Sequence, residues 1–133
     1  YCCNVKPPSW PDGLDVSVFT SETLALAAKE ARLLSEREHV VPWMWKESSL
    51  EKGNRLQVGN VPAPHDMSSA RWTVDDPRDY IMLRTLAETM GNKRLLDAGW
   101  LEIMDCIGAH PEIAKLNAGI ERDEGLRQSR AAD

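Results

Sequence analysis

Three carboxylates stand close together in the segment Arg71–Tyr80, which reads RWTVDDPRDY. Aromatic and β-branched residues run up to Val74 and favour a short strand, and the proline that follows suits the first position of a helix. Asp76 is then the N-cap of that helix, with Asp79 as its partner in a capping-box-like pair. Asp75 has no such role, and it would lie at the carboxyl end of a strand, where open α/β sheets bind ligands. A solvated loop aspartate fits the local sequence equally well.

This segment also resembles a known motif. RWTVDDPRDY is similar to RWTVDTPEDYE near the end of spore-coat polysaccharide biosynthesis proteins of the cytidylyltransferase type, which are relatives of acylneuraminate and 3-deoxy-manno-octulosonate cytidylyltransferases. In those relatives the first aspartate of VDTPED is a ligand of the catalytic magnesium, and it aligns with Asp75. The resemblance therefore implies that Asp75 binds Mg²⁺ and that Arg71 belongs to the substrate-binding site.

A second match begins at Trp10, where WPDGLDVSVFT resembles the family's YPDGLDVEVFS. That motif lies at the acceptor side of the active site in the full enzymes. The resemblance implies substrate-binding roles for Asp12, Gly13 and Asp15. It also shows a departure, because Ser17 stands where the family has a glutamate.

A third match covers residues 35–46, where SEREHVVPWMWK resembles SEREHVTPYIYK. By this resemblance Glu38 and His39 lie near the sugar-side pocket. The local sequence alone offers plainer roles, since Ser35 and Glu38 have the spacing of a capping box and His39 would be a surface residue in a first helical turn. Val41 replaces a threonine, a second loss of polarity on the acceptor side.

The resemblance extends to the tail, where LNAGIERDEGLRQSR is similar to LNAxIxRNEGYxxSL. We expect residues 121–133 to form a surface tail that frays. The match spans nearly the whole chain but only the second half of the family's sequence. The loop of the form AxRxxSxRLPGK, which grips the nucleoside triphosphate, and the DxP aspartate, the other magnesium ligand, do not occur in these 133 residues. Together with a first residue that is tyrosine, this leads us to expect a fragment.

Hydrophobic periodicity predicts the elements that position these residues. We expect strands over residues 14–19, 56–58 and 71–74, and helices over residues 21–34, 35–45, 77–90 and 96–107, with a short helix from Pro111. In the helix over residues 77–90, the predicted buried stripe consists of Tyr80, Leu83, Ala87 and Met90. The expected fold class is α/β: one incomplete domain over residues 1–133, forming the C-terminal half of a three-layer α/β/α, Rossmann-like nucleotide-diphospho-sugar transferase fold with a mixed sheet and flanking helices.

Composition excludes several classes of partner. The net charge of −5 argues against binding to nucleic acid or to an anionic membrane surface, because both require a basic face. No apolar run approaches the roughly 20 residues of a membrane span. The three cysteines have no metal-ligand spacing, and they are typical of reduced thiols in a cytoplasmic protein.

These observations predict a Mg²⁺-dependent nucleotidyltransferase that uses a nucleoside triphosphate, CTP by resemblance, to activate a sugar or sugar acid for polysaccharide biosynthesis. By itself this chain is expected to be inactive, and its unpaired strand edges are expected to self-associate or to pair with the missing N-terminal half. The alternative is a non-catalytic interaction module or partner subunit descended from such an enzyme. A metal-binding regulator built on His65 and Asp66 is a third possibility, although two ligands without a third are more often a polar loop.

Overall fold

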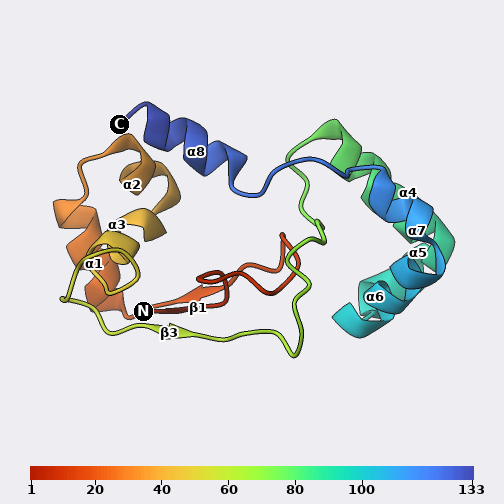
Figure 1. Cartoon of the computed structure of the whole chain (residues 1–133), viewed down its shortest axis with the longest axis horizontal. Helices are drawn as coiled ribbons and strands as arrows, with labels where there is room; N and C mark the ends of the chain where they lie inside the picture. The colour runs from red at the N-terminus through yellow and green to blue at the C-terminus, as the bar shows by residue number, and fades with distance from the viewer. The chain divides into compact units, whose positions relative to one another are not determined.

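The computed structural model describes residues 1–133, which divide into two compact units (Figure 1). Unit 1 comprises Tyr1–Trp10, Asp15–Met67 and Glu121–Asp133, and unit 2 comprises Pro11–Leu14 and Ser68–Ile120. No helix in either unit has both the length and the apolar character needed to cross a membrane.

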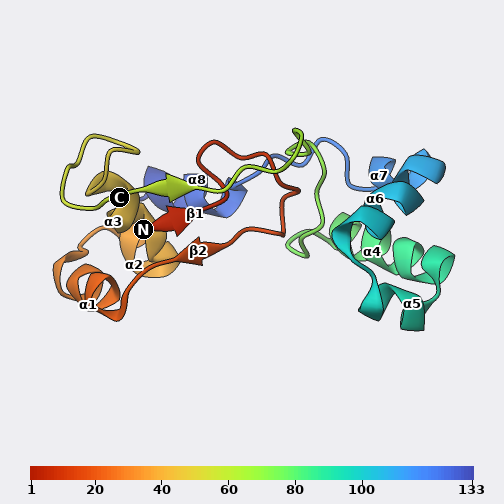
Figure 2. The same ribbon diagram turned by 90° about the horizontal axis from the view of Figure 1, so that it is seen from below.

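Unit 1 contains a small mixed sheet with flanking helices, which confirms the predicted fold class. Its strands are β1 (Cys2–Cys3), β2 (Ser17–Val18) and β3 (Gly59–Asn60), in the order β2-β1-β3 (Figure 2). The central strand β1 pairs antiparallel with β2 and parallel with β3. The helices are α1 (Ser21–Glu30), α2 (Leu34–His39), α3 (Val41–Lys46) and α8 (Glu124–Ala131).

The core of unit 1 lies between α1 and α3. Ala27 and Ala31 pack with Trp43 and Met44, and partly buried hydrophobic residues pack against this cluster. The sequence leaves the N-cap of α1 open between Thr20 and Ser21. In the structure it is Thr20, whose hydroxyl accepts a hydrogen bond from the backbone N–H of Thr23. This cluster fixes α1 and α3 relative to each other.

The turn between α1 and α2 differs from the prediction. The prediction of a helix reaching residue 34 is wrong, because α1 ends at Glu30. The buried carboxylate of Glu36 accepts hydrogen bonds from the backbone N–H groups of Arg32 and Leu33, at 2.9 and 3.2 Å. It also forms an ion pair with Lys46 Nζ at 2.7 Å. Glu36 rather than Ser35 therefore organises the start of α2, so the predicted Ser35–Glu38 capping box is wrong.

The predicted helix over residues 35–45 is two short helices. The break falls at Val40, whose φ is 66°, and Pro42 lies in the first turn of α3. The proline thus delays the second helix, as expected from its missing N–H.

Two predicted strands are much shorter than expected or displaced. Of residues 14–19 only Ser17–Val18 form a strand, and Val16 and Val18 face solvent while Ser17 and Phe19 turn inward. Tyr1 decides this orientation, because its hydroxyl bonds Ser17 Oγ at 2.8 Å and its ring stacks on Phe19. The strand expected over residues 56–58 lies at Gly59–Asn60 instead.

Unit 2 is helical, with α4 (Pro77–Met90), α5 (Asn92–Asp97), α6 (Trp100–Ala109) and α7 (Pro111–Lys115). The bounds of α4 match the prediction, but its buried stripe matches only in part. Asp79, Met82 and Leu86 are buried, Leu83 and Met90 pack partly buried against this core, and Tyr80 is 58% exposed. Met82 and Leu86 pack against Ile113 of α7. The single helix predicted over residues 96–107 is split into α5 and α6.

The strand predicted over residues 71–74 is absent from the structure. Arg71 makes one isolated β-bridge with Asp12, and the segment up to Asp76 is irregular. Residues 121–133 were expected to form a surface tail that frays, but residues 124–131 form α8.

Candidate functional site

Arg71 is the centre of the candidate site in unit 2. Its Nε and Nη2 donate to the two carboxylate oxygens of Asp79, at 2.9 and 2.8 Å, which is the bidentate geometry of a strong ion pair. Its Nη1 donates to Asp12 Oδ2 at 2.7 Å. One guanidinium therefore joins the Asp12 loop to the first turn of α4.

Asp79 is fully buried beneath this pair. Besides Arg71, its carboxylate accepts hydrogen bonds from Asn117 Nδ2 at 2.8 Å and from the backbone N–H groups of Asp75 and Asp76, at 3.1 and 3.0 Å. Burial alone would raise the pKa of Asp79, but the bonds from Arg71 and Asn117 outweigh it and hold that pKa far below its usual range. Asp79 is thus an ionised core group that fixes the backbone on which Asp75 is carried.

The Asp12–Gly13 loop is held against the same segment by its backbone. Asp12 N–H donates to the Ala70 carbonyl at 2.9 Å, and Trp72 N–H donates to the Asp12 carbonyl at 2.7 Å. Gly13 has a φ of +103°, and a Cβ there would lie 2.7 Å from the carbonyl carbon of Trp72. Only glycine fits this close approach.

Asp75 is the exposed carboxylate of the group. Its side chain is 75% exposed, it accepts a hydrogen bond from Thr73 Oγ1 at 2.9 Å, and Arg71 Nη2 lies 3.6 Å away. Arg71 pairs more closely with Asp12 and Asp79, which leaves the Asp75 carboxylate open to solvent. Asp76 is the N-cap of α4 and accepts from the Arg78 N–H at 2.9 Å, which confirms its predicted role.

Asp75 could bind magnesium only together with ligands from outside this chain. No cluster of three or more histidine, cysteine or acidic side chains able to hold a metal ion exists in the chain, so neither Asp75 nor the His65–Asp66 pair belongs to an all-protein metal site. Magnesium commonly binds through one or two carboxylates and takes its other ligands from phosphates and water. A single exposed carboxylate fits that pattern.

The other predicted acceptor residues lie in unit 1. Glu38 and His39 stand at the end of α2, and both contact Ser129 of α8: Ser129 Oγ is 2.6 Å from Glu38 Oε2 and 3.0 Å from His39 Nε2. Asp15 forms an ion pair with Arg122, which also donates to the Trp10 carbonyl at 3.1 Å. The structure therefore brings together Asp12, Gly13, Arg71 and Asp75 in one unit, and Glu38 and His39 in the other.

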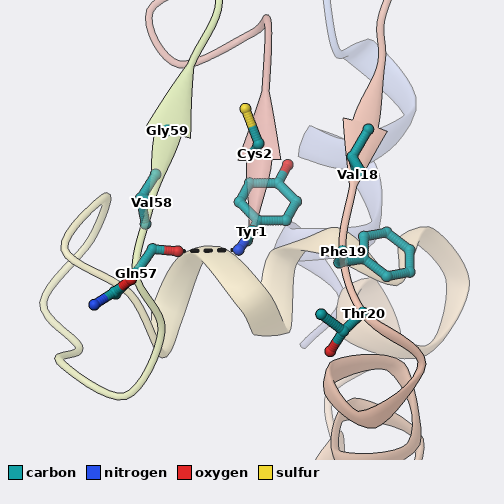
Figure 3. Close-up of a pocket in the computed structure, with 8 residues that line it drawn as sticks. All are labelled: Tyr1, Cys2, Val18, Phe19, Thr20, Gln57, Val58 and Gly59. Atoms are coloured by element: carbon teal, nitrogen blue, oxygen red, sulfur yellow. Dashed lines mark hydrogen bonds between the residues drawn. The ribbon is translucent and has the colours of Figure 1, made fainter.

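Ser17, which replaces the glutamate of the similar family, is already engaged. Tyr1 Oη accepts from Trp45 Nε1 at 2.9 Å and bonds Ser17 Oγ, so the three polar groups form a neutral chain. Tyr1 also lines a pocket of about 450 Å³ (Figure 3). Its lining comes from the three strands and their flanks: Tyr1, Cys2, Val18, Phe19, Thr20, Gln57, Val58 and Gly59.

The sequence did not predict three features of these sites: that Asp79 is buried, that the Asn117 amide binds it, and that the Ser129 hydroxyl contacts Glu38 and His39. Asn117 and Ser129 both lie within the tail match LNAxIxRNEGYxxSL, so that motif was the available signal. Asp79 was given only its capping role, because a cap explains the residue without reference to the rest of the chain.

Comparison with known proteins finds similarity in both sequence and structure. A scan against protein-family models finds no match. An uncharacterized protein of Methanocaldococcus jannaschii is 26% identical over 110 residues, which cover 83% of this chain and 43% of that protein. A cytidylyltransferase from Leptospira borgpetersenii superposes on 91% of this chain with a TM-score of 0.75 and 25% identity. The fold resembles that of a cytidylyltransferase.

The cytidylyltransferase resemblance expected from the sequence motifs is thus supported by an independent likeness of structure. The chain spans less than half the length of either protein, 43% of one and 47% of the other. The likeness therefore concerns the part of a cytidylyltransferase fold that this chain covers.

Proposed function

We propose that this chain forms the acceptor-side part of a nucleotidyltransferase of the cytidylyltransferase type, which activates a sugar or sugar acid for surface or spore-coat polysaccharide synthesis. The observation that carries the proposal is the Arg71 network. It joins the Asp12–Gly13 loop to the segment that bears Asp75. Asp12 and Arg71, which make the contact, are 59 residues apart in the sequence. Both motifs resemble active-site motifs of that family, and the fold is similar to that of a cytidylyltransferase.

In this proposal Asp75 contributes one carboxylate to a Mg²⁺ ion bound with the nucleoside triphosphate, CTP by resemblance. Such an ion would offset charge on the phosphoryl oxygens during transfer to the acceptor. Within unit 2, Asp12 and Gly13 shape the loop beside Asp75. Asp15, Glu38 and His39 of unit 1 are assigned to sugar binding by the resemblance of their motifs to those of the family. The buried pair of Arg71 and Asp79 keeps the Asp75 backbone in place.

The nucleotide-gripping loop would come from a separate segment, since these 133 residues contain no glycine-rich phosphate-binding motif. The surface of β2 favours a partner: it is an edge strand of the sheet, and Val16 and Val18 beside and within it are more than half exposed. Edge strands with apolar side chains recruit other chains. We expect self-association of this chain at micromolar concentration, measured by analytical ultracentrifugation, and a clean monomer would contradict it.

The same surface is the specific observation in favour of the second candidate function, a non-catalytic interaction module. The two candidates differ in what they bind. A nucleotidyltransferase part must bind Mg²⁺ with nucleotide or sugar through Asp75, whereas an interaction module needs neither.

Isothermal titration with CTP, ATP, GTP and UTP in the presence of Mg²⁺, followed by N-acetylneuraminate, tests the proposal. We expect binding that is weakened at least about tenfold in Asp75→Asn, the scale of a lost charge-assisted contact. The matched control is Asp76→Asn, which removes the adjacent charge and retains an N-cap. Equal binding by both variants would refute the role of Asp75.

The same mixtures are assayed for pyrophosphate. We expect none from the chain alone, because nothing in it resembles the family's nucleotide-gripping loop. Turnover that disappears in Asp75→Asn would overturn the division of labour and make this chain a complete enzyme.

A further inference from the structure

In unit 1, helix α8 packs against helix α2 (Figure 1). Two separate polar contacts join α2 to α8 and to the residues that follow α8. At the start of α2, the Asp133 carboxylate accepts hydrogen bonds from the Ser35 N–H at 2.9 Å and from the Ser35 hydroxyl at 2.6 Å. At its end, Ser129 contacts Glu38 and His39. The first contact can hold α8 in place without the second.

The Ser129 hydroxyl has three possible hydrogen-bond partners. Glu38 Oε2 lies at 2.6 Å, the Gly125 carbonyl at 3.1 Å, and His39 Nε2 at 3.0 Å. A hydroxyl has one proton, and a charged carboxylate at the shortest distance forms the strongest hydrogen bond. Ser129 therefore donates to Glu38.

This assignment decides the protonation of the His39 ring. Because the Ser129 proton is directed to Glu38, the serine oxygen faces His39 with a lone pair, so His39 Nε2 must carry the hydrogen. Nδ1 of the neutral ring is then an acceptor. It has no protein partner, and the His39 side chain is 30% exposed.

Glu38 has the same character. Its Oε2 is used by Ser129, its Oε1 has no protein partner, and its side chain is 55% exposed. Two neighbouring, partly exposed side chains thus each carry one acceptor atom that no protein group binds. Adjacent hydroxyl groups of a sugar are donors that match such a pair.

We propose that Ser129 is a positioning residue: it holds His39 as the Nε2–H tautomer and directs Nδ1, together with Glu38 Oε1, to the hydroxyl groups of a sugar. The choice of a sugar as ligand rests on the proposed function. The positioning of His39 by Ser129 does not, because it follows from the three contacts of one hydroxyl.

Nuclear magnetic resonance of the ¹⁵N-labelled chain tests the positioning. The chain has three histidines, and His39→Gln identifies the signals of His39. In mildly alkaline buffer we expect a slowly exchanging Nε2–H resonance and an unprotonated Nδ1 in the unaltered chain. Ser129→Ala removes the acceptor, so the Nε2–H resonance should be lost to exchange with water, while Ser129→Thr keeps a hydroxyl and should retain it.

Asp133→Asn is the matched control, because it weakens the other contact between α8 and α2 without touching His39. We expect it to retain the Nε2–H resonance. Loss of the resonance in Asp133→Asn would mean that docking of α8 as a whole protects the ring, and persistence in Ser129→Ala would mean that Ser129 does not hold it. Either result overturns the proposal.

Titration of the same samples with N-acetylneuraminate tests the ligand. We expect Ser129→Ala to weaken binding about 3- to 10-fold, the effect of one neutral hydrogen bond, and Asp133→Asn to leave it unchanged. Absence of binding to the unaltered chain would overturn the sugar assignment and count against the proposed function. The resonance measurements would still decide the role of Ser129, so the two failures are distinguishable.

Discussion

Replacing Asp79 with asparagine should cost unit 2 most of its stability. Asn keeps the size of the side chain but removes the charge that Arg71 pairs with, and its amide NH₂ would face a donor. Removing one partner of a buried ion pair typically costs about 3–5 kcal/mol. Unit 2 has fewer than 60 residues, a size at which folded domains are marginal, so a loss on this scale leaves little stability.

Urea unfolding followed by circular dichroism measures the cost, and hydrogen exchange of the α4 amides assigns it to unit 2. The matched control is Asp76→Asn, three residues away. Asn is as good an N-cap as Asp, and the exposed pair of Asp76 with Arg78 is worth at most about 1 kcal/mol, so this variant should unfold within about 1 kcal/mol of the unaltered chain. An Asp79→Asn variant that lies equally close would refute the view that the buried pair organises the site.

The remaining predictions use the same unfolding assay. Because the pKa of Asp79 is depressed in the folded chain, its contribution is complete above the unfolded pKa of about 3.9 and falls by about 1.4 kcal/mol per pH unit below it; Asp79→Asn should lack this slope, and parallel pH profiles would contradict the assignment. Gly13→Ala should destabilise the chain by about 1–3 kcal/mol, because alanine is strained at a φ of +103° and its Cβ would meet the Trp72 backbone; an unchanged urea midpoint would show that the loop can move aside. Glu36→Gln should cost about 1–3 kcal/mol, because it loses the charge that binds Lys46 and places an amide NH₂ in a buried position that faces other donors; exposed Glu88→Gln is its neutral control.

The sequence by itself determined the features that depend on a single turn of chain. The order Asp76, Pro77, Asp79 placed the start of α4 correctly, and the pair Thr20 and Ser21 marked the start of α1. N-caps and first-turn prolines act within three or four residues, so they can be seen without the tertiary structure. The similarity to cytidylyltransferases was also visible in the motifs, and the structural comparison supports it.

Only the tertiary structure decided which side of α4 is buried. Asp79 lies opposite Arg71, eight residues away, and Asn117, 38 residues away, and a buried carboxylate must have such partners. Its burial turns Met82 and Leu86 inward and leaves Tyr80 exposed, against the apolar pattern of the sequence. The same holds for His39: the hydroxyl that fixes its ring belongs to Ser129, 90 residues later, and no local pattern specifies a contact between groups so far apart in the chain.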